Sequence, residues 1–393
     1  MMWEKTTIGK HCTVTSSKRF HLSDRSDSGI PFYCSKEIIQ KVNGQEITDY
    51  DYIKVEAYEE VKKKFGVPEC GDLLITTRGT YGVPYLYNAE DKFYFADGNL
   101  TWLKDFDDLL VAEFLYYWIL SYEGQKKIDA IAKGTAQKAV PIALIKDIEL
   151  SIPDVEMQKK IAKILTAYDD FIENNQKQIK LLEEAAQRLY KEWFVDLRFP
   201  GYEDVEIVDG VPEGWKEEKL IDIANVQYGF AFDSSLFNSQ GKGKQIIRIR
   251  NIPSGITDDY TTQEADEQYI VSNGDIVVGM DGEFHINSWC GKTAYLVQRT
   301  CKFIPKKELM RGWLLQAIYG PIKYFEKTVV GATVAHLGKK HIDTIELLTG
   351  PDELYIPFKT LFDKRQLLLN QNILLSEARD RLLPKLMSGE IEV

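Results

Sequence analysis

The side chains in this sequence best suited to hold a metal ion or attack a substrate are five histidines and five cysteines. The histidines include no His-Glu-x-x-His motif and no group with the spacing of metal ligands. The cysteines are odd in number and contain no Cys-x-x-Cys pair, which argues against a disulfide framework or structural zinc. We therefore predict no metal site, and free thiols in a reducing compartment. These residues are His11, His21, His285, His336, His341, Cys12, Cys34, Cys70, Cys290 and Cys301.

Motifs for catalysis and for cofactor binding are also missing from the sequence. It has no Gly-x-Gly-x-x-Gly turn to seat a nucleotide, no Gly-x-Ser-x-Gly elbow, and no Asn/Asp-Pro-Pro-Tyr/Phe tetrapeptide of an amino-methyltransferase. Gly291-Lys292-Thr293 matches the end of a phosphate-binding loop, but Ile286 stands where that loop requires glycine. These omissions favour a binding protein over an enzyme.

The sequence repeats once, with a period near half its length, and the matches occur in the same order in both halves. Gly-Asp-Leu-Leu-Ile at 71–75 matches Gly-Asp-Ile-Val-Val at 274–278. Leu-Leu-Glu-Glu-Ala at 181–185 matches Leu-Leu-Ser-Glu-Ala at 374–378. A single duplication predicts two domains of one fold.

Each half begins with a mixed region of short β-rich runs, such as 72–77 and 246–252, and ends in a long helical segment. A Pro-Asp pair precedes each helix, and both residue types favour a first helical turn. We predict an α+β fold: two similar mixed α/β domains with two long antiparallel coiled-coil helices, related by a pseudo-two-fold repeat. The predicted boundaries are a first domain at 1–152, a first helix at 153–198, a second domain at 199–350, and a second helix with the C-terminal tail at 351–393.

Apolar residues recur along both helical segments at steps of four and three, the heptad pattern of a coiled-coil seam. The second seam is interrupted by Arg365, Asn372 and Arg379. The predicted seam positions are Ile161, Leu165, Tyr168, Ile172, Asn175, Ile179, Leu182, Leu189, Leu361, Leu368, Asn372, Leu375 and Leu382.

A helix over 154–193 would be roughly 60 Å long at about 1.5 Å per residue. We expect the two helices to pack antiparallel as a rod with a domain at each end; alternatively, each helix docks only on its own domain. The seam amides Asn175 and Asn372 either fix the pairing register or lie at a wet edge of the seam.

The charge balance is acidic, with 49 Lys and Arg against 60 Asp and Glu, giving a net charge of −11. Taken alone, that balance argues against a nucleic-acid binder, whose binding surface is basic. The N-terminus lacks the apolar region of a signal peptide, and apolar runs such as 114–120 are too short to span a bilayer. We therefore expect a cytoplasmic protein with no membrane partner.

Several segments together resemble the specificity subunits of type I restriction-modification systems. They are 188–201 (Arg-Leu-Tyr-Lys-Glu-Trp-Phe-Val-Asp-Leu-Arg-Phe-Pro-Gly), 381–393 (Arg-Leu-Leu-Pro-Lys-Leu-Met-Ser-Gly-Glu-Ile-Glu-Val), 29–33, 71–75 and 247–251. The resemblance covers essentially the whole chain. The C-terminal segment together with the duplicated plan is specific, whereas Gly-Asp before apolar residues is a weak signal alone.

The resemblance implies a non-catalytic subunit of a bacterial or archaeal, nucleoid-associated complex. Each domain would be a target recognition domain reading one half of an asymmetric bipartite site in double-stranded DNA. The helices would set the gap between the half-sites and dock two modification (methyltransferase) subunits. S-adenosylmethionine would bind those subunits, and ATP and Mg would bind any restriction subunits present. The alternatives are a coiled-coil scaffold protein with two binding heads, and a single-chain restriction enzyme, which the missing catalytic motifs disfavour.

Under this interpretation, base-reading residues are polar side chains on loops and strand ends of the two domains. Arg248 and Arg250 are expected on one face of a strand, because alternate residues share a face. The candidates in the first half are Lys18, Arg19, Lys36, Arg78, Thr80, Tyr81, Lys133, Gln137 and Lys138. Those in the second half are Tyr228, Arg248, Arg250, Asn251, His285, Lys292 and His336.

The two halves differ at one matching loop, where Thr-Arg-Gly-Thr-Tyr at 77–81 aligns with Met-Asp-Gly-Glu-Phe at 280–284. Basic Arg78 therefore corresponds to acidic Asp281, which predicts that the domains read different sequences. Asp281 and Glu283 either accept hydrogen bonds from cytosine amino groups or cap a turn. Because the basic candidates lie in the domains and many acidic residues along the helices, the overall negative charge is compatible with DNA binding. The overall negative charge also predicts weak DNA binding by the subunit alone.

Overall fold

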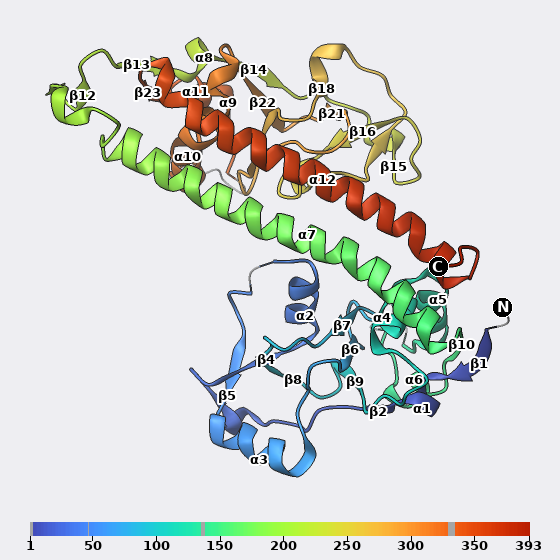
Figure 1. Ribbon diagram of the computed structural model, residues 1–393. Helices are drawn as coiled ribbons and strands as arrows, with labels where there is room; N and C mark the ends of the chain where they lie inside the picture. The colour runs from blue at the N-terminus through green and yellow to red at the C-terminus, as the bar shows by residue number, and fades with distance from the viewer. Residues whose placement is uncertain (1–2, 46, 135–137, 329–334) are drawn as a thin grey trace. The chain divides into compact units, whose positions relative to one another are not determined.

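The computed structural model describes residues 3–45, 47–134, 138–328 and 335–393, which form two compact units. The first unit comprises Met1–Glu173 and Leu375–Val393, and the second comprises Asn174–Leu374. Two long helices, Val155–Tyr190 (α7) and Ile356–Met387 (α12), each contribute one part to each unit (Figure 1). No helix of the described residues is long and apolar enough to cross a membrane.

The first unit contains a four-stranded antiparallel sheet in the order β2-β9-β6-β7. Its strand Leu73–Thr76 (β6) is buried along its whole length, because its alternate side chains enter two different apolar clusters. Leu73 and Ile75 join the cluster around Phe114, whereas Leu74 joins the cluster around Trp102. The other strands of this sheet are Thr13–Thr15 (β2), Leu100–Lys104 (β9) and Pro84–Leu86 (β7).

A second sheet of the first unit has the order β3-β5-β4-β8, and Glu4–Thr7 (β1) pairs separately with Glu149–Ile152 (β10). The strands of the second sheet are Arg25–Ser26 (β3), Asp51–Ile53 (β5), Ile30–Tyr33 (β4) and Tyr94–Phe95 (β8). The short helices of this unit are Ile8–His11 (α1), Ser35–Val42 (α2), Val55–Phe65 (α3), Ala112–Leu120 (α4), Tyr122–Ile131 (α5), Ile142–Ile145 (α6) and the 3-10 turn Leu22–Asp24 (η1).

The second unit repeats this plan and confirms the duplication. Its four-stranded antiparallel sheet has the order β14-β22-β19-β20, and β13 pairs with β23 as β1 pairs with β10. These strands are Ala224–Tyr228 (β14), Thr300–Pro305 (β22), Ile276–Gly279 (β19), Ile286–Ser288 (β20), Lys216–Lys219 (β13) and Glu346–Thr349 (β23). The helices are Leu220–Ile223 (α8), Arg311–Ala317 (α9), Tyr319–Thr328 (α10) and Lys339–Ile342 (α11).

The remaining sheet of the second unit has the order β15-β17-β16-β21-β18, and a separate hairpin precedes the domain. The strands are Phe237–Asn238 (β15), Tyr260–Thr261 (β17), Lys244–Ile247 (β16), Ala294–Leu296 (β21), Ile270–Val271 (β18), and in the hairpin Ile207–Val208 (β11) and Val211–Pro212 (β12). The 3-10 turns are Tyr202–Asp204 (η3), Ser234–Leu236 (η4), Ile249–Asn251 (η5), Glu267–Tyr269 (η6), Glu308–Met310 (η7) and Asp352–Tyr355 (η8).

The repeated Gly-Asp pair has a structural cause in both units. Gly71 and Gly274 lie in the left-handed region, with φ of 95° and 87°, where a side chain would be strained. The following aspartate closes the turn: Asp72 accepts a hydrogen bond from the Glu69 amide, and Asp275 accepts one from Ser272, both at 2.9 Å. The motif therefore turns the chain into a buried central strand, β6 or β19.

In the first unit, the start of α7 packs into the domain core beside the end of α12. Ile161 and Leu165 share one apolar cluster with Phe114 and Leu386. A polar contact joins the two helices where Arg379 of α12 donates to Asp169 of α7 at 2.5 Å. Asp169 also accepts a hydrogen bond from Tyr117 of α4 at 2.6 Å, which links the domain to the helix pair.

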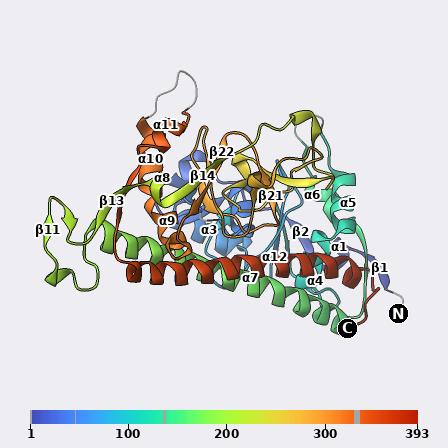
Figure 2. The same ribbon diagram turned by 90° about the horizontal axis from the view of Figure 1, so that it is seen from above.

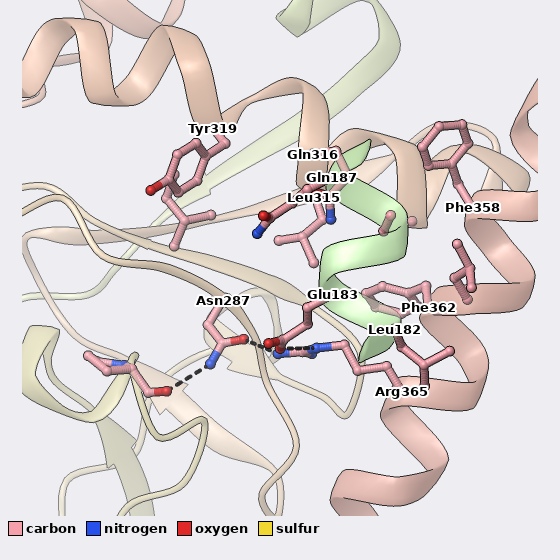
Figure 3. A pocket seen from close by; sticks show the side chains of 15 residues that line it. Leu182, Glu183, Gln187, Asn287, Leu315, Gln316, Tyr319, Phe358, Phe362 and Arg365 are labelled. Carbon is pink, nitrogen blue, oxygen red and sulfur yellow. Dashed lines mark hydrogen bonds and ion pairs between the residues drawn. The ribbon is translucent and has the colours of Figure 1, made fainter. Parts of the chain in front are cut away.

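In the second unit, the end of α7 lies antiparallel to the start of α12 (Figure 2). The Asn175 amide donates to Asn372 at 2.9 Å. Arg365 is buried and donates to Glu183 of α7 and to Asn287 and Ser288 of β20 (Figure 3). Pairing of the helices and docking of each helix on a domain therefore both occur. The predicted seam residues are buried or half-buried, and the buried Asn175 rules out a wet edge there.

Three local predictions need correction. The strand expected over 246–252 ends at Ile247, because the Asn251 side chain accepts a hydrogen bond from the Arg248 amide at 2.9 Å and stabilises the 3-10 turn η5 instead. The first helix, predicted over 153–198, is α-helical only to Tyr190 and ends in a π-helical turn, Lys191–Val195 (η2). Pro351-Asp352 begins the 3-10 turn η8 rather than α12, which starts at Ile356. In contrast, Asp154 caps α7 as expected, accepting from the Met157 amide at 2.9 Å.

Candidate nucleic-acid interface

The loops that follow β6 and β19 occupy the same place in the two domains. Each has a glycine in the left-handed region, Gly79 with φ of 70° and Gly282 with φ of 69°. Each also forms one β-bridge to the segment preceding the last short helix of its domain, Arg78 to Ala139 and Asp281 to His336. Arg78 and Asp281 are therefore structurally equivalent positions with opposite charge.

In the first domain, basic side chains gather around the loop after β6. Arg78 is exposed, and its backbone forms a β-bridge to Ala139. Ala139 forms a second β-bridge to Lys133, and Lys138 directly precedes Ala139 in the sequence. Gln137 lies outside the described residues. Thr80 uses its carbonyl to accept a hydrogen bond from Thr76 at 2.8 Å. A hydrogen bond to Asp129 raises the pKa of Tyr81.

A turn before β9 brings further predicted residues toward the same loop. The Arg78 guanidinium lies 3.6 Å from the point where a Cβ on Gly98 would stand. Arg19 forms an ion pair with Asp97 at 3.0 Å, next to that glycine. Ser35 donates to the Asn99 carbonyl at 3.0 Å, which places the start of α2, with the exposed Lys36, at this turn. Lys36 lies 3.6 Å from Asp49.

Lys18 is held differently from these residues. Its ammonium lies 4.2 Å from the centre of the Phe65 ring, on α3, and its amide donates to the Tyr94 hydroxyl at 2.9 Å. The ammonium thus packs over an aromatic ring, although the residue as a whole is exposed. The structure gives Lys18 a local packing partner at the edge of the domain.

In the second domain, the loop after β19 borders an open hollow. The Asp281 carboxylate lines it: one oxygen accepts from His336 at 2.5 Å, and the other pairs with Arg299. Burial raises the pKa of Asp281, but the hydrogen bonds from His336 and Arg299 outweigh it, so the net shift is downward. The hollow is lined by Tyr228, Gly229, Met280, Asp281, Gln298, Arg299, Thr300 and His336.

Two predicted residues of the second domain, Tyr228 and His336, line this hollow. Burial raises the pKa of the Tyr228 hydroxyl to about 12, which keeps it protonated as a hydrogen-bond donor. Each oxygen of the Asp281 carboxylate already has a partner, His336 on one and Arg299 on the other. The structure gives Asp281 a further role as an anchor for Arg299 and His336, and its two predicted roles stay predictions.

The other predicted residues of the second domain lie outside the lining of the hollow. Arg248 and Arg250 do not share a strand face, since both lie at the turn η5. Arg250 donates to both oxygens of Asp259, at 2.5 and 2.7 Å, and Arg248 lies over the Phe237 ring. Asn251 caps this turn.

His285 and Lys292 are also separate from the hollow. The His285 ring lies 3.7 Å from Glu283, and Lys292 follows Gly291 on an exposed loop before β21. The Lys292 carbonyl accepts a hydrogen bond from the Trp289 indole at 2.8 Å.

Arg299 is the functional candidate that sequence analysis missed. It lies on the short turn between β21 and β22, and its side chain reaches Asp281 from across the hollow. β6 and β19 each pair with the strand after such a turn, which brings the turn next to the loop already singled out, but only the structure shows this pairing. In the described part of the chain, no group of three or more His, Cys, Asp or Glu side chains is placed to hold a metal ion.

The chain thus has two domains of one fold, with a polar loop at the same place in each that carries opposite charge at one position. The family described as "Type I restriction modification DNA specificity domain" matches residues 2–184 and 212–353. The chain belongs to this family, and the resemblance seen in its sequence is confirmed.

Specificity subunits from other organisms are similar to this chain over most of their length. The MjaIX specificity subunit of Methanocaldococcus jannaschii is 26% identical over 380 residues, covering 90% of this chain and 86% of the relative. The HindI specificity subunit of Haemophilus influenzae is 24% identical, covering 88% and 90%. The crystal structure of a type I restriction-modification S subunit from M. genitalium has the same fold, with a TM-score of 0.60 at 17% identity over 98% of this chain and 96% of that chain.

Proposed function

We propose that this chain directs a type I restriction-modification complex to an asymmetric bipartite site in double-stranded DNA, each domain reading one half. The observation that carries the proposal is the pair Arg78 and Asp281, which hold one position of one fold with opposite charge. Arginine donates to base acceptors, whereas the Asp281 carboxylate holds Arg299 and His336 beside it, so the second loop offers other side chains to DNA. Two such loops favour two different half-sites.

The helix pair supports a role in setting the gap between the half-sites. Arg365, Asn372 and Arg379 follow one another at heptad spacing along α12, and each contacts α7, at Glu183, Asn175 and Asp169. Sliding one helix by a heptad would place an arginine against the asparagine and leave a buried polar group without its partner. We infer that this polar ladder fixes the register, and that a fixed register defines the gap.

Exposed leucines on the helices support docking of two modification subunits. Leu181 of α7 and Leu374 of α12 occupy matching positions of the sequence repeat, and their exposed fractions are 64% and 65%. A single exposed leucine is common on a protein surface, but these two hold matching positions of the repeat, and we place a repeated partner contact there. Two equivalent positions fit two copies of one partner, which brings S-adenosylmethionine. Restriction subunits, using ATP and Mg, would join the same complex in the cytoplasm.

A mobility-shift experiment with the modification subunits present tests the proposal. Duplexes with two defined half-sites, identified by methylome sequencing of a host carrying this gene, are compared with scrambled duplexes at fixed salt. We expect tighter binding of the bipartite duplex, and loss of that preference when either half-site is scrambled. Equal affinity for all duplexes would refute sequence reading and favour a scaffold protein.

A further inference from the structure

Arg299 is an exposed arginine that is held both by an ion pair and by a left-handed backbone. Its side chain is 66% exposed, yet one guanidinium nitrogen pairs with Asp281, whose carboxylate is only 12% exposed. Its backbone has φ of 70°, a left-handed conformation that side-chain-bearing residues adopt at a cost. Such strain at a non-glycine residue persists where the surrounding structure imposes it, and it is concentrated at functional sites.

The anchoring carboxylate leaves most of the guanidinium donors available. Arginine has five N–H donors in a planar fork, and Asp281 engages the Nη1 nitrogen. His336 engages the second oxygen of Asp281 at 2.5 Å, so the carboxylate is held between two side chains on opposite segments. The fork of Arg299 is thereby positioned at the rim of the hollow before any ligand arrives.

We propose that Arg299 is a specificity-determining residue of the second domain and reads a guanine base edge, with Asp281 and His336 as positioning residues. This inference rests on the proposed function. A guanine edge in the major groove presents two acceptors, O6 and N7, side by side, and the arginine fork matches their spacing. Holding the fork in advance reduces the conformational entropy lost on binding.

The first domain places a guanidinium beside the equivalent turn by a different route. There Arg78 extends from the loop after the central strand toward Gly98. In the second domain the acidic residue stands on that loop, and the arginine extends from the turn toward it. The arginine therefore comes from the loop in the first domain and from the turn in the second. We infer that the two guanidinium groups approach DNA from different directions. This exchange gives a physical reason for unlike half-sites.

The test uses the complete complex with its modification subunits and a DNA pool in which each position of both half-sites is varied in turn. The principal variant is Arg299→Gly, because glycine adopts the left-handed backbone without strain and removes the side chain. We expect discrimination at one guanine of the second half-site to fall roughly 5- to 150-fold, with the first half-site unchanged. Arg299→Lys should retain overall affinity but lose the same preference, since an ammonium is not a planar fork.

Two further variants separate the roles. Asp281→Asn should weaken the same preference by a smaller factor, because it removes the charge that holds the fork without removing the fork. Arg198→Ala, an exposed and paired arginine of the second unit outside the hollow, is the matched control and should leave every preference unchanged.

Three results would overturn the inference. A uniform loss of affinity over all sequences, with a shallower salt dependence, would make Arg299 a phosphate contact. An unchanged profile for Arg299→Gly would remove it from recognition altogether. A shift at a position other than guanine would refute the base assigned. The unaltered complex in the same pool keeps the two proposals apart, because absence of any bipartite preference there would refute the proposed function itself.

Discussion

Asn175 donates an amide hydrogen bond to Asn372 at 2.9 Å, joining α7 to α12 within the second unit. Both residues occupy seam positions that are otherwise apolar, and Asn175 is only 7% exposed. An amide pair in such a seam satisfies its hydrogen bonds only when the two residues meet. The contact thus selects one register among the several that a heptad pattern permits.

Replacing one asparagine by leucine should destabilise the protein more than replacing both. Asn175→Leu leaves the Asn372 amide without this partner, at a cost of about 1–3 kcal/mol in unfolding free energy. The double variant, Asn175→Leu with Asn372→Leu, should recover most of that stability but broaden the range of DNA gaps that the complex accepts. Denaturant unfolding and a library of variable gaps measure the two effects. Equal stability of the single and double variants would contradict the pairing.

Arg365 should be the most sensitive position on α12. It is buried and donates to Glu183 at 2.6 Å, to Ser288 at 2.6 Å and to Asn287 at 2.9 Å, so that it ties both helices to β20 (Figure 3). Arg365→Ala removes three hydrogen bonds from a buried network, and we expect a loss of about 2–4 kcal/mol in unfolding free energy, measured by denaturant unfolding.

Arg381→Ala is the matched control for Arg365. Arg381 lies on the same helix with its side chain 81% exposed and pairs with Glu377 at 3.9 Å. Such exposed pairs contribute less than about 1 kcal/mol. A similar loss in both variants would mean that the buried network does not account for the effect at Arg365.

Inserting one heptad into both helices at matching points should lengthen the preferred gap. Seven residues add roughly 10 Å to a helix, which corresponds to about three base pairs. The gap preference is read from methylation of a library with variable spacers. Insertion into one helix alone is the control and should impair binding to every spacer, because it breaks the polar ladder. A gap that stays the same after the double insertion would refute the ruler.

Arg78→Ala should change recognition of the first half-site and leave the second unaltered. Arg78 is exposed on the loop after β6, and no carboxylate of the described residues forms an ion pair with it. A base contact of arginine accounts for roughly 1–3 kcal/mol of discrimination at one position. Methylation of a pool with a randomised first half-site measures it. A uniform decline in methylation across all sequences would instead identify Arg78 as a phosphate contact.

Leu181→Asp and Leu374→Asp should each weaken one modification-subunit contact. A charge on an exposed position leaves the fold intact but opposes burial at an interface. Light scattering of the purified complex should show one modification subunit lost in each single variant and both lost in the double variant. Lys364→Asp, at an exposed position of α12, is the control for added negative charge. An unchanged stoichiometry in the double variant would place the docking surface elsewhere.

The sequence predicts those features that repeat or recur with a regular period. Gly71-Asp72 and Gly274-Asp275 mark the central strands because glycine and aspartate make one turn locally, within four residues. The seam residues follow from heptad spacing. The alignment of Arg78 with Asp281 holds in three dimensions because both stand beside a left-handed glycine.

The partners of polar residues were not predictable in this way. Glu183 lies 182 positions from Arg365, and the contact depends on the register of two helices. Arg299 depends on a turn whose position relative to Asp281 is set by sheet pairing. Arg250 was expected on a strand, but the Asn251 side chain competes for the backbone and forms a turn. Composition and periodicity do not predict hydrogen bonds between residues far apart in sequence, nor side chains that compete for the backbone of a strand.

The division of the chain between its two units has a consequence for biosynthesis. The second unit is one continuous stretch, Asn174–Leu374, whereas the first requires Leu375–Val393 in addition to its own N-terminal residues. Leu386 and Met387 complete the apolar cluster that contains Ile161 and Leu165. During translation, the first unit can complete its apolar core only after the last turns of α12 have been made. The second unit has all of its residues earlier, so its core can form first.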